Sequence, residues 1–264
     1  MSEYDYLNAR VRGMSRHLLD RETFEDLLQA GGEDVLMDVL LESSYGEELR
    51  SELGRGHGLD VVEDALRRSL SKSVHHVLSL APEEPARLLA LQLNRWDVQN
   101  IVTILRGVLR ASTGDEIMAS MVPAGQFRVA QLAELAAETE VTDVADALTT
   151  WNYRFAYPIR QAIREQARGR DHAQMETQLM STYFQWALSQ LSHDDENEAI
   201  LRRHLRMQVD LINIVGSLHI VSDRDRKGGP RESERMERLP GGFLGGAVLD
   251  EIEEQPNVAM APSP

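Results

Sequence analysis

Apolar residues recur every three or four positions along most of the chain, a spacing that places them on one face of an α-helix. The longest run predicts one buried stripe, formed by Leu59, Val62, Leu66, Leu70, Val74 and Val77. Alternating patterns of strand length and hairpin turn dipeptides are scarce. The sequence therefore predicts an all-α fold, with helices at about 3–18, 22–30, 33–43, 59–80, 85–111, 114–121, 126–138, 142–151, 153–168, 171–191 and 196–221.

The pattern changes after the last of these helices. Residues 222–246 are charged and rich in glycine, which is typical of a linker. A short amphipathic segment follows at 247–254. The composition of the tail, residues 256–264, predicts disorder.

An internal repeat organises the rest of the chain. From Asp97, the sequence reads Asp, apolar, any, Asn, Ile, Val, any, any, Leu, and the stretch from Asp210 reads the same way. The two stretches are about 113 positions apart and place Asn100 and Asn213 at matching positions. Such repetition predicts two copies of one helical unit.

Two further registers agree with this repeat. The turn at 123–125 and the apolar pattern after it recur from Pro240, about 117 positions later. Residues 27–45 align with residues 135–153, about 108 positions later. We therefore expect tandem similar helical-bundle lobes, arranged as an N-terminal helix at 1–19, lobe 1 at 20–122, lobe 2 at 123–222, a linker with a partial, truncated third lobe at 223–255, and the tail at 256–264.

The repeated Asp-x-x-Asn pair is the candidate site. Two residues three apart share a face of a helix, here beside a buried apolar stripe. A buried carboxylate or amide is costly unless it is hydrogen-bonded or charge-paired. We expect the pairs to brace neighbouring helices by binding a backbone group or an arginine, and the candidates are Asp97 with Asn100, and Asp210 with Asn213.

Arg10 and Arg12, on the predicted first helix, are the candidate partners of Asp97. Removing the carboxylate would then leave a buried guanidinium unpaired, at a cost of about 3–5 kcal/mol. A catalytic or metal-binding role is disfavoured, because the same pair recurs in both units and no reactive group accompanies either copy.

Composition excludes several classes of function. The chain has 264 residues with 28 basic and 43 acidic side chains, a formal charge of −15, so it should repel nucleic acid and anionic lipid. It contains no cysteine, which excludes disulfides, thiolate metal sites and a cysteine nucleophile. No apolar run reaches the roughly 18 residues of a membrane span, and the N-terminus lacks a signal-peptide core. The expected protein is soluble and cytosolic, and would meet a membrane only through another protein.

Motifs for bound cofactors and catalysis are missing. The sequence holds no phosphate-binding loop of the Walker type, no dinucleotide fingerprint and no nucleophile elbow, so no cofactor is expected. His75 and His76 would point about 100° apart on a helix, a poor chelate. The most metal-like cluster is at 193–198, where Asp194, Asp195 and Glu198 also suit the cap and first turn of the following helix, and we favour capping.

The order of these motifs resembles one family. The stretch at 6–14, the Tyr45-Gly46 step, the segment at 96–100 with its apolar helix, the segment at 210–213 and the turn at 240–243 are together similar to the family of the V-type ATPase d subunit and the archaeal-type (A-type) ATP synthase C subunit. The resemblance covers about residues 4–254. No single motif is as specific as a Walker loop, but their order and spacing together are fairly specific.

The resemblance implies a non-catalytic rotor protein, a funnel of three similar helical lobes. Such a protein seats the central stalk of an A/V-type rotary ATPase on the cytoplasmic face of the proteolipid ring during proton or sodium transport. The implied partners are the cytoplasmic loops of the ring and the proteins of the central stalk. The implied location is peripheral, on the cytoplasmic side of the membrane.

The sequence departs from this family in its third lobe, which ends after one helix. A wedge rather than a closed funnel is then expected, and the flank of lobe 2 would need another cover. Two other functions stay open beside the rotor role. One is a helical-repeat scaffold for a different protein partner. The other is an all-α metal-dependent enzyme that uses Asp194, Asp195 and Glu198, although no second carboxylate cluster supports it.

Overall fold

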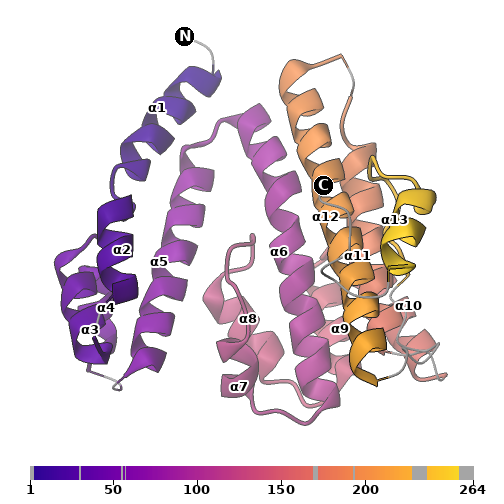
Figure 1. Cartoon of the computed structure of the whole chain (residues 1–264), viewed down its shortest axis with the longest axis horizontal. Helices are drawn as coiled ribbons and strands as arrows, with labels where there is room; N and C mark the ends of the chain where they lie inside the picture. Colours follow the sequence, from indigo (N-terminus) through magenta and orange to yellow (C-terminus); the bar gives the residue numbers. More distant parts are fainter. Residues whose placement is uncertain are drawn as a thin grey trace. The chain divides into compact units, whose positions relative to one another are not determined.

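The predicted all-α fold is confirmed by a computed structural model, which describes residues 3–29, 31–54, 56, 58–168, 172–192, 194–227 and 237–255. Within these ranges the chain forms α-helices and no β-strand (Figure 1). No helix in the same ranges is long and apolar enough to cross a membrane. The predicted tail at 256–264 and residues 228–236 of the predicted linker lie outside the described residues.

The chain divides into two compact units. Unit 1 comprises residues 1–100 and 114–134, and unit 2 comprises residues 101–113 and 135–264. The division therefore falls inside two helices, α6 (Glu83–Leu109) and α8 (Val129–Ala136). The lobes expected at 20–122 and 123–222 follow the sequence repeat instead, and their boundaries stay a prediction.

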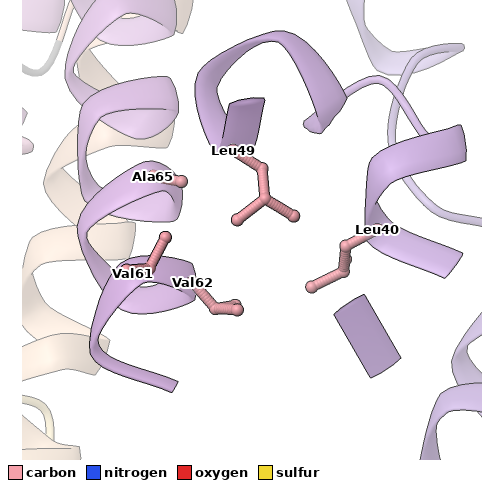
Figure 2. Close-up of a cluster of buried hydrophobic side chains, with 5 residues drawn as sticks. All are labelled: Leu40, Leu49, Val61, Val62 and Ala65. Carbon is pink, nitrogen blue, oxygen red and sulfur yellow. The ribbon is translucent and has the colours of Figure 1, made fainter. Parts of the chain in front are cut away.

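Unit 1 contains most of the N-terminal helices and a small aliphatic core. Its complete helices are α1 (Glu3–Ser15), α2 (Arg21–Gln29), α3 (Glu33–Glu42), α4 (Gly46–Glu52), α5 (Leu59–Leu80) and α7 (Gly114–Ala119). Leu40 of α3 and Leu49 of α4 point toward α5, where Val61, Val62 and Ala65 complete the cluster (Figure 2). These residues are between 1% and 6% exposed, so they form a buried core between α3, α4 and α5.

The buried stripe predicted on α5 is wrong for half of its members. Val62 is buried, but Leu59, Leu66 and Leu70 are 53%, 37% and 40% exposed. The inward face of α5 is centred on Val61 and Ala65 instead. A three-and-four spacing indicates that a helix is amphipathic, but which edge of its stripe is covered depends on the neighbours, and here these are short helices with small cores.

Unit 2 has a larger, partly aromatic core. Its complete helices are α9 (Val141–Thr150), α10 (Ala156–Gln166), α11 (His172–Ser189), α12 (Glu196–Lys227) and α13 (Gly246–Glu253). Tyr183 and Phe184 on α11 are fully buried. Their rings meet edge to face with centroids 4.9 Å apart, and Phe155 meets Trp186 in the same way at 5.2 Å. Aromatic pairs of this geometry each add about 0.5–1.5 kcal/mol beyond the burial of their area.

The helices recur in the order that the repeat predicts. Helices α3 and α9 begin 108 positions apart, α5 and α11 begin 113 apart, and α6 and α12 also begin 113 apart. Helix α4, which the apolar pattern alone did not predict, has its counterpart in α10, and these two begin 110 positions apart. Helix α12 runs to Lys227, six residues beyond the end expected from the sequence. The spacing of about 108–113 positions that relates the sequence repeats therefore also relates the helices of the structure.

Candidate functional site

Asp97 lies in the middle of α6 and binds a loop far along the chain. Its side chain is buried, with 1% of the residue exposed. The backbone N–H of Gln126 donates to Oδ2 and the N–H of Phe127 donates to Oδ1, both at 3.0 Å. Each carboxylate oxygen thus accepts one amide, which is the kind of hydrogen bonding that makes a buried carboxylate tolerable.

Asn100 binds the start of the same loop, one helical turn after Asp97. Its Nδ2 donates to the carbonyl oxygen of Val122 at 2.8 Å, and the N–H of Val122 donates to its Oδ1 at 3.0 Å. The side-chain amide therefore pairs reciprocally with one backbone residue. We call Asp97, Asn100 and the loop 122–127 clasp 1.

The same geometry recurs on α12. Asp210 accepts the N–H of Phe243 at Oδ2 and the N–H of Leu244 at Oδ1, both at 3.0 Å. Asn213 donates to the carbonyl oxygen of Leu239 at 2.9 Å and accepts the N–H of Leu239 at 2.8 Å. We call Asp210, Asn213 and the loop 239–244 clasp 2. Each atom of clasp 1 that bonds has its counterpart in clasp 2.

A glycine in each loop makes room for the carboxylate. A Cβ atom at Gly125 would lie 1.9 Å from Oδ1 of Asp97, and one at Gly242 would lie 2.1 Å from Oδ1 of Asp210. Both distances are far below van der Waals contact, so a larger residue would displace the carboxylate from its amides. The turns at 123–125 and 240–242, which recur in the sequence, are therefore parts of the same two clasps as the Asp-x-x-Asn pairs.

Each loop leads directly into a short helix. Helix α8 begins at Val129 and α13 at Gly246, 117 positions apart, and both are eight residues long. Each helix buries matching apolar residues: Leu132 and Leu135 in α8, and Leu249 and Ile252 in α13. Each clasp therefore ties the entry of a short helix to the middle of a long helix, α8 to α6 and α13 to α12.

The two clasps differ in the basic side chain that flanks the loop. At clasp 1, the imidazole of His75 lies with Nε2 3.3 Å from the carbonyl oxygen of Gln126 and Nδ1 2.9 Å from that of Ser71. At clasp 2, Arg206 donates to the carbonyl oxygens of Gly241 and Gly242 at 3.1 and 2.7 Å. Its guanidinium also lies 4.0 Å from the centroid of the Phe243 ring, which is a cation–π arrangement.

Burial changes the acidity of clasp 1. Desolvation raises the pKa of Asp97 from 3.8 to about 6, although the amides of Phe127 and Gln126 and the charge of His75 oppose the rise. Between these two pH values the folded chain holds a proton that the unfolded chain has lost. The resulting stabilisation is complete below the unfolded pKa and is lost as pH rises through about 6.

We therefore expect the stability advantage of the wild type over Asp97→Asn to fall between pH 4 and pH 7. The expected decrease is about 3 kcal/mol, because each unit of pKa shift corresponds to about 1.4 kcal/mol. Urea unfolding of both proteins across this range measures it. Ionisable groups that do not interact with Asp97 titrate alike in both proteins and cancel in the difference; His75, whose charge acts on Asp97, is replaced by glutamine in both. A difference that stays flat or grows with pH would contradict the assigned shift.

The structure does not bring Arg10 or Arg12 to the candidate site. Both residues are exposed on α1, and within the described part of the chain neither makes a hydrogen bond or ion pair with Asp97. Two backbone amides occupy the carboxylate oxygens instead. Of the two kinds of partner considered for the Asp-x-x-Asn pair, the structure therefore places the backbone there.

The acidic cluster before α12 acts as a helix cap. Oδ1 of Asp195 accepts the N–H of Glu198 at 2.9 Å, and the Glu198 carboxylate accepts the N–H of Ser192. The predicted capping role of this segment is thus confirmed for Asp195. Residue 193 of this cluster lies outside the described residues. Among the residues that are described, no three acidic or histidine side chains gather as a metal site.

Comparison with known proteins identifies the family of the chain. The sequence model of the ATP synthase (C/AC39) subunit family matches residues 7–256. The C subunit of a V-type ATP synthase from Deinococcus radiodurans is 26% identical over 245 residues, which is 93% of this chain and 66% of that protein. The C subunit of an A-type ATP synthase from Methanosarcina acetivorans is 29% identical over 236 residues, 89% of this chain and 62% of that protein.

A third relative shows where similarity is higher over a shorter stretch. The A-type ATP synthase C subunit of Halobacterium salinarum is 31% identical over 148 residues, 56% of this chain and 42% of that protein. The chain thus spans about two thirds, or less, of the length of these relatives. Because the family match extends over nearly all of the sequence and the fold is all-helical, the chain belongs to the ATP synthase (C/AC39) subunit family.

Proposed function

We propose that this chain is a non-catalytic rotor component of an A/V-type rotary ATPase, joining the central stalk to the membrane proteolipid ring. The family match over residues 7–256 is the observation that carries the proposal. The relatives from Deinococcus and Methanosarcina are named as C subunits of V-type and A-type ATP synthases. Proton or sodium transport would then be a property of the complex, and this chain would contribute no active site of its own.

The clasps suit a part that transmits torque. In clasp 1, Asp97 and Asn100 hold the loop 122–127 through bonds to the backbone of three of its residues. Backbone groups cannot change rotamer, so such a joint resists sliding of the loop along the helix. The two bonds to the Asp97 carboxylate contribute about 1.5–3 kcal/mol each, and the two bonds of the neutral Asn100 amide about 0.5–1.5 kcal/mol each. Clasp 2 repeats the arrangement, and a chain of stiff joints transmits a twist with little loss.

The acidic charge is consistent with a partner that exposes basic loops. A formal charge of −15 disfavours direct binding to anionic lipid. Complementary charge would instead steer the chain toward basic cytoplasmic loops of the ring. In this proposal the protein is peripheral, lies on the cytoplasmic side of the membrane and reaches the membrane only through the ring.

Co-purification tests the proposal. When a tagged version of the full chain is expressed in its native cells and captured in mild detergent, we expect proteolipid and central-stalk proteins to be recovered with it. The variant Gly242→Ala, which breaks clasp 2, should lose both partners. The variant Gly245→Ala is the matched control, since a Cβ there meets nothing within 4 Å.

The recovered proteins decide between the open functions. Recovery of one unrelated protein at equal abundance, without ring or stalk proteins, would favour the helical-repeat scaffold and contradict the rotor proposal. Loss of partners in the Gly245→Ala control would show that the capture does not report on the clasp.

A further inference from the structure

Unit 1 contains a partly open cavity. At the matching position of unit 2, aromatic side chains pack against each other. The cavity has a volume of about 430 Å³, within the range of about 300–1,000 Å³ typical of binding pockets. The end of α1, the connection before α4 and the outer face of α5 form its walls. Its apolar lining includes Val11, Met14, Leu18, Tyr45 and Val77.

Two of these apolar side chains are unusually exposed. Val11 is 38% exposed and Leu18 is 63% exposed. The position of the α1 end is nevertheless fixed, because the Ser44 hydroxyl donates to the carbonyl oxygen of His17. One side-chain hydrogen bond thus links two walls of the cavity, while the walls leave apolar area uncovered.

The repeat register shows what occupies the matching position in unit 2. Helices α5 and α11 begin 113 positions apart, so Ser73 corresponds to Trp186. The connection before α10 is two residues longer than the one before α4, so the spacing of 108 found for residues 27–45 becomes 110 at these helices. Tyr45, the N-cap of α4, therefore corresponds in the structure to Phe155, the N-cap of α10, and not to Tyr153 as the sequence alignment suggests. Ser73 and Tyr45 line the cavity. Their counterparts in unit 2, Trp186 and Phe155, pack edge to face with ring centroids 5.2 Å apart.

A cation completes the arrangement in unit 2. The guanidinium of Arg154 lies 4.2 Å from the centroid of the Trp186 ring. The matching residue in unit 1 is Ser44, which also lines the cavity and carries no charge. The rim of the cavity is acidic instead: Glu47 is exposed there, and Glu48 is paired with Lys72 at 2.8 Å.

From this comparison we propose that the cavity binds an aromatic side chain, with a basic residue beside it, presented by a partner protein. The ring occupies the space that Trp186 fills in unit 2 and packs on Tyr45, as Trp186 packs on Phe155. The basic residue pairs with Glu47 and supplies the charge that Arg154 supplies in unit 2. The thioether of Met14 adds a favourable contact with the ring edge.

The proposal does not depend on assembly with an ATP synthase, because it follows from the walls of unit 1 alone. Two kinds of experiment test it with the full chain. The first fills the cavity from within, and the second offers it a defined probe.

The filling variant is Ser73→Trp, which introduces the residue of the sister helix. We expect its melting temperature to rise by about 2–4 °C, the shift for roughly 1 kcal/mol of added packing in a chain of this size. Ser79→Trp is the matched control, because Ser79 is exposed on the same helix and does not line the cavity. A destabilised Ser73→Trp beside an unchanged Ser79→Trp would show that no ring fits and would overturn the proposal.

The probes are three capped dipeptides, acetyl-Trp-Arg-amide, acetyl-Trp-Glu-amide and acetyl-Ala-Arg-amide. Methyl NMR spectra should show saturable shifts at Val11, Met14 and Val77 with the first probe. We expect affinity to fall by about tenfold with the second and third, and to be lost in Ser73→Trp. Equal binding of all three probes, or binding that Ser73→Trp leaves intact, would contradict the proposed site. Equal binding of the two Trp probes would show that the basic residue is not recognised and would contradict that part of the proposal.

Discussion

Replacing Gly125 by alanine should lower the free energy of unfolding by about 3 kcal/mol or more. The new methyl group would lie 1.9 Å from Oδ1 of Asp97 and 3.0 Å from the backbone nitrogen of the same residue. The carboxylate has to leave, and the amides of Gln126 and Phe127 then lose their acceptor. Chemical denaturation followed by circular dichroism measures the change.

Two further glycine variants calibrate this result. Gly242→Ala should cost somewhat less than Gly125→Ala, because its closest obstacles are side-chain atoms of Asp210 and Val209 and no backbone atom is among them. Gly245→Ala is the neutral control: the residue has a φ of −75° and open space around it, so a change within about 0.5 kcal/mol is expected. If Gly125→Ala proved as stable as Gly245→Ala, the cradle described for clasp 1 would be wrong.

Removing the carboxylate itself should affect the two clasps unequally. We expect Asp97→Ala to cost about 3–5 kcal/mol, because two backbone amides lose their partner and one of them, in Phe127, is buried. Asp210→Ala should cost roughly 1–2 kcal/mol less. Phe243 is 51% exposed, so water can reach the freed amides of that loop.

The control for these variants is Asp38→Ala, which removes an exposed carboxylate from α3. It should change stability by no more than about 0.5 kcal/mol. Hydrogen exchange adds a local test, since the amides of Gln126 and Phe127 should lose protection in Asp97→Ala. An Asp210→Ala variant less stable than Asp97→Ala would show that exposure of the loop does not govern the cost.

The repeated pair is visible in the sequence, but its partner is not. Spacing places Asp97 and Asn100 on one face of a helix, and the cost of burial requires that they be bonded. Every non-proline residue carries a backbone amide, so the sequence does not single out Gln126 and Phe127 as donors. Arg10 is a candidate partner because a sequence shows which side chains are charged, whereas it does not show the geometry of the backbone.

A usable signal for the loop is nevertheless present. The turns at Pro123 and Pro240 recur 117 positions apart, close to the 113 that separate Asp97 from Asp210. Two features that repeat in nearly the same register are candidates for contact with each other. The glycine that each turn contains gives the reason, because only a residue without a Cβ admits the carboxylate.

Two elements of unit 1 show the limits of the apolar pattern. Helix α4 has seven residues and reads GEELRSE, so its one large apolar side chain, Leu49, produces no periodicity although it is 1% exposed. On α5 the periodicity is clear, but Leu66 and Leu70 are exposed, whereas Tyr183, which matches Leu70 on α11, is fully buried. The apolar pattern locates a long helix well, but it does not show which edge of the apolar stripe is covered by neighbouring helices.

Because each clasp binds main-chain atoms, the exposed side chains of its loop, such as Gln126 and Phe243, can change without loss of the clasp hydrogen bonds. The loops at 122–127 and 239–244 read VPAGQF and LPGGFL, yet they present the same amides and carbonyls to the same two side chains. Drift in the loops therefore leaves the coupling intact as long as a glycine persists at Gly125 and Gly242. Exchanging the two loops between the helices should therefore preserve the clasp hydrogen bonds, although it also changes buried side chains at Ala124, Phe127 and Leu239.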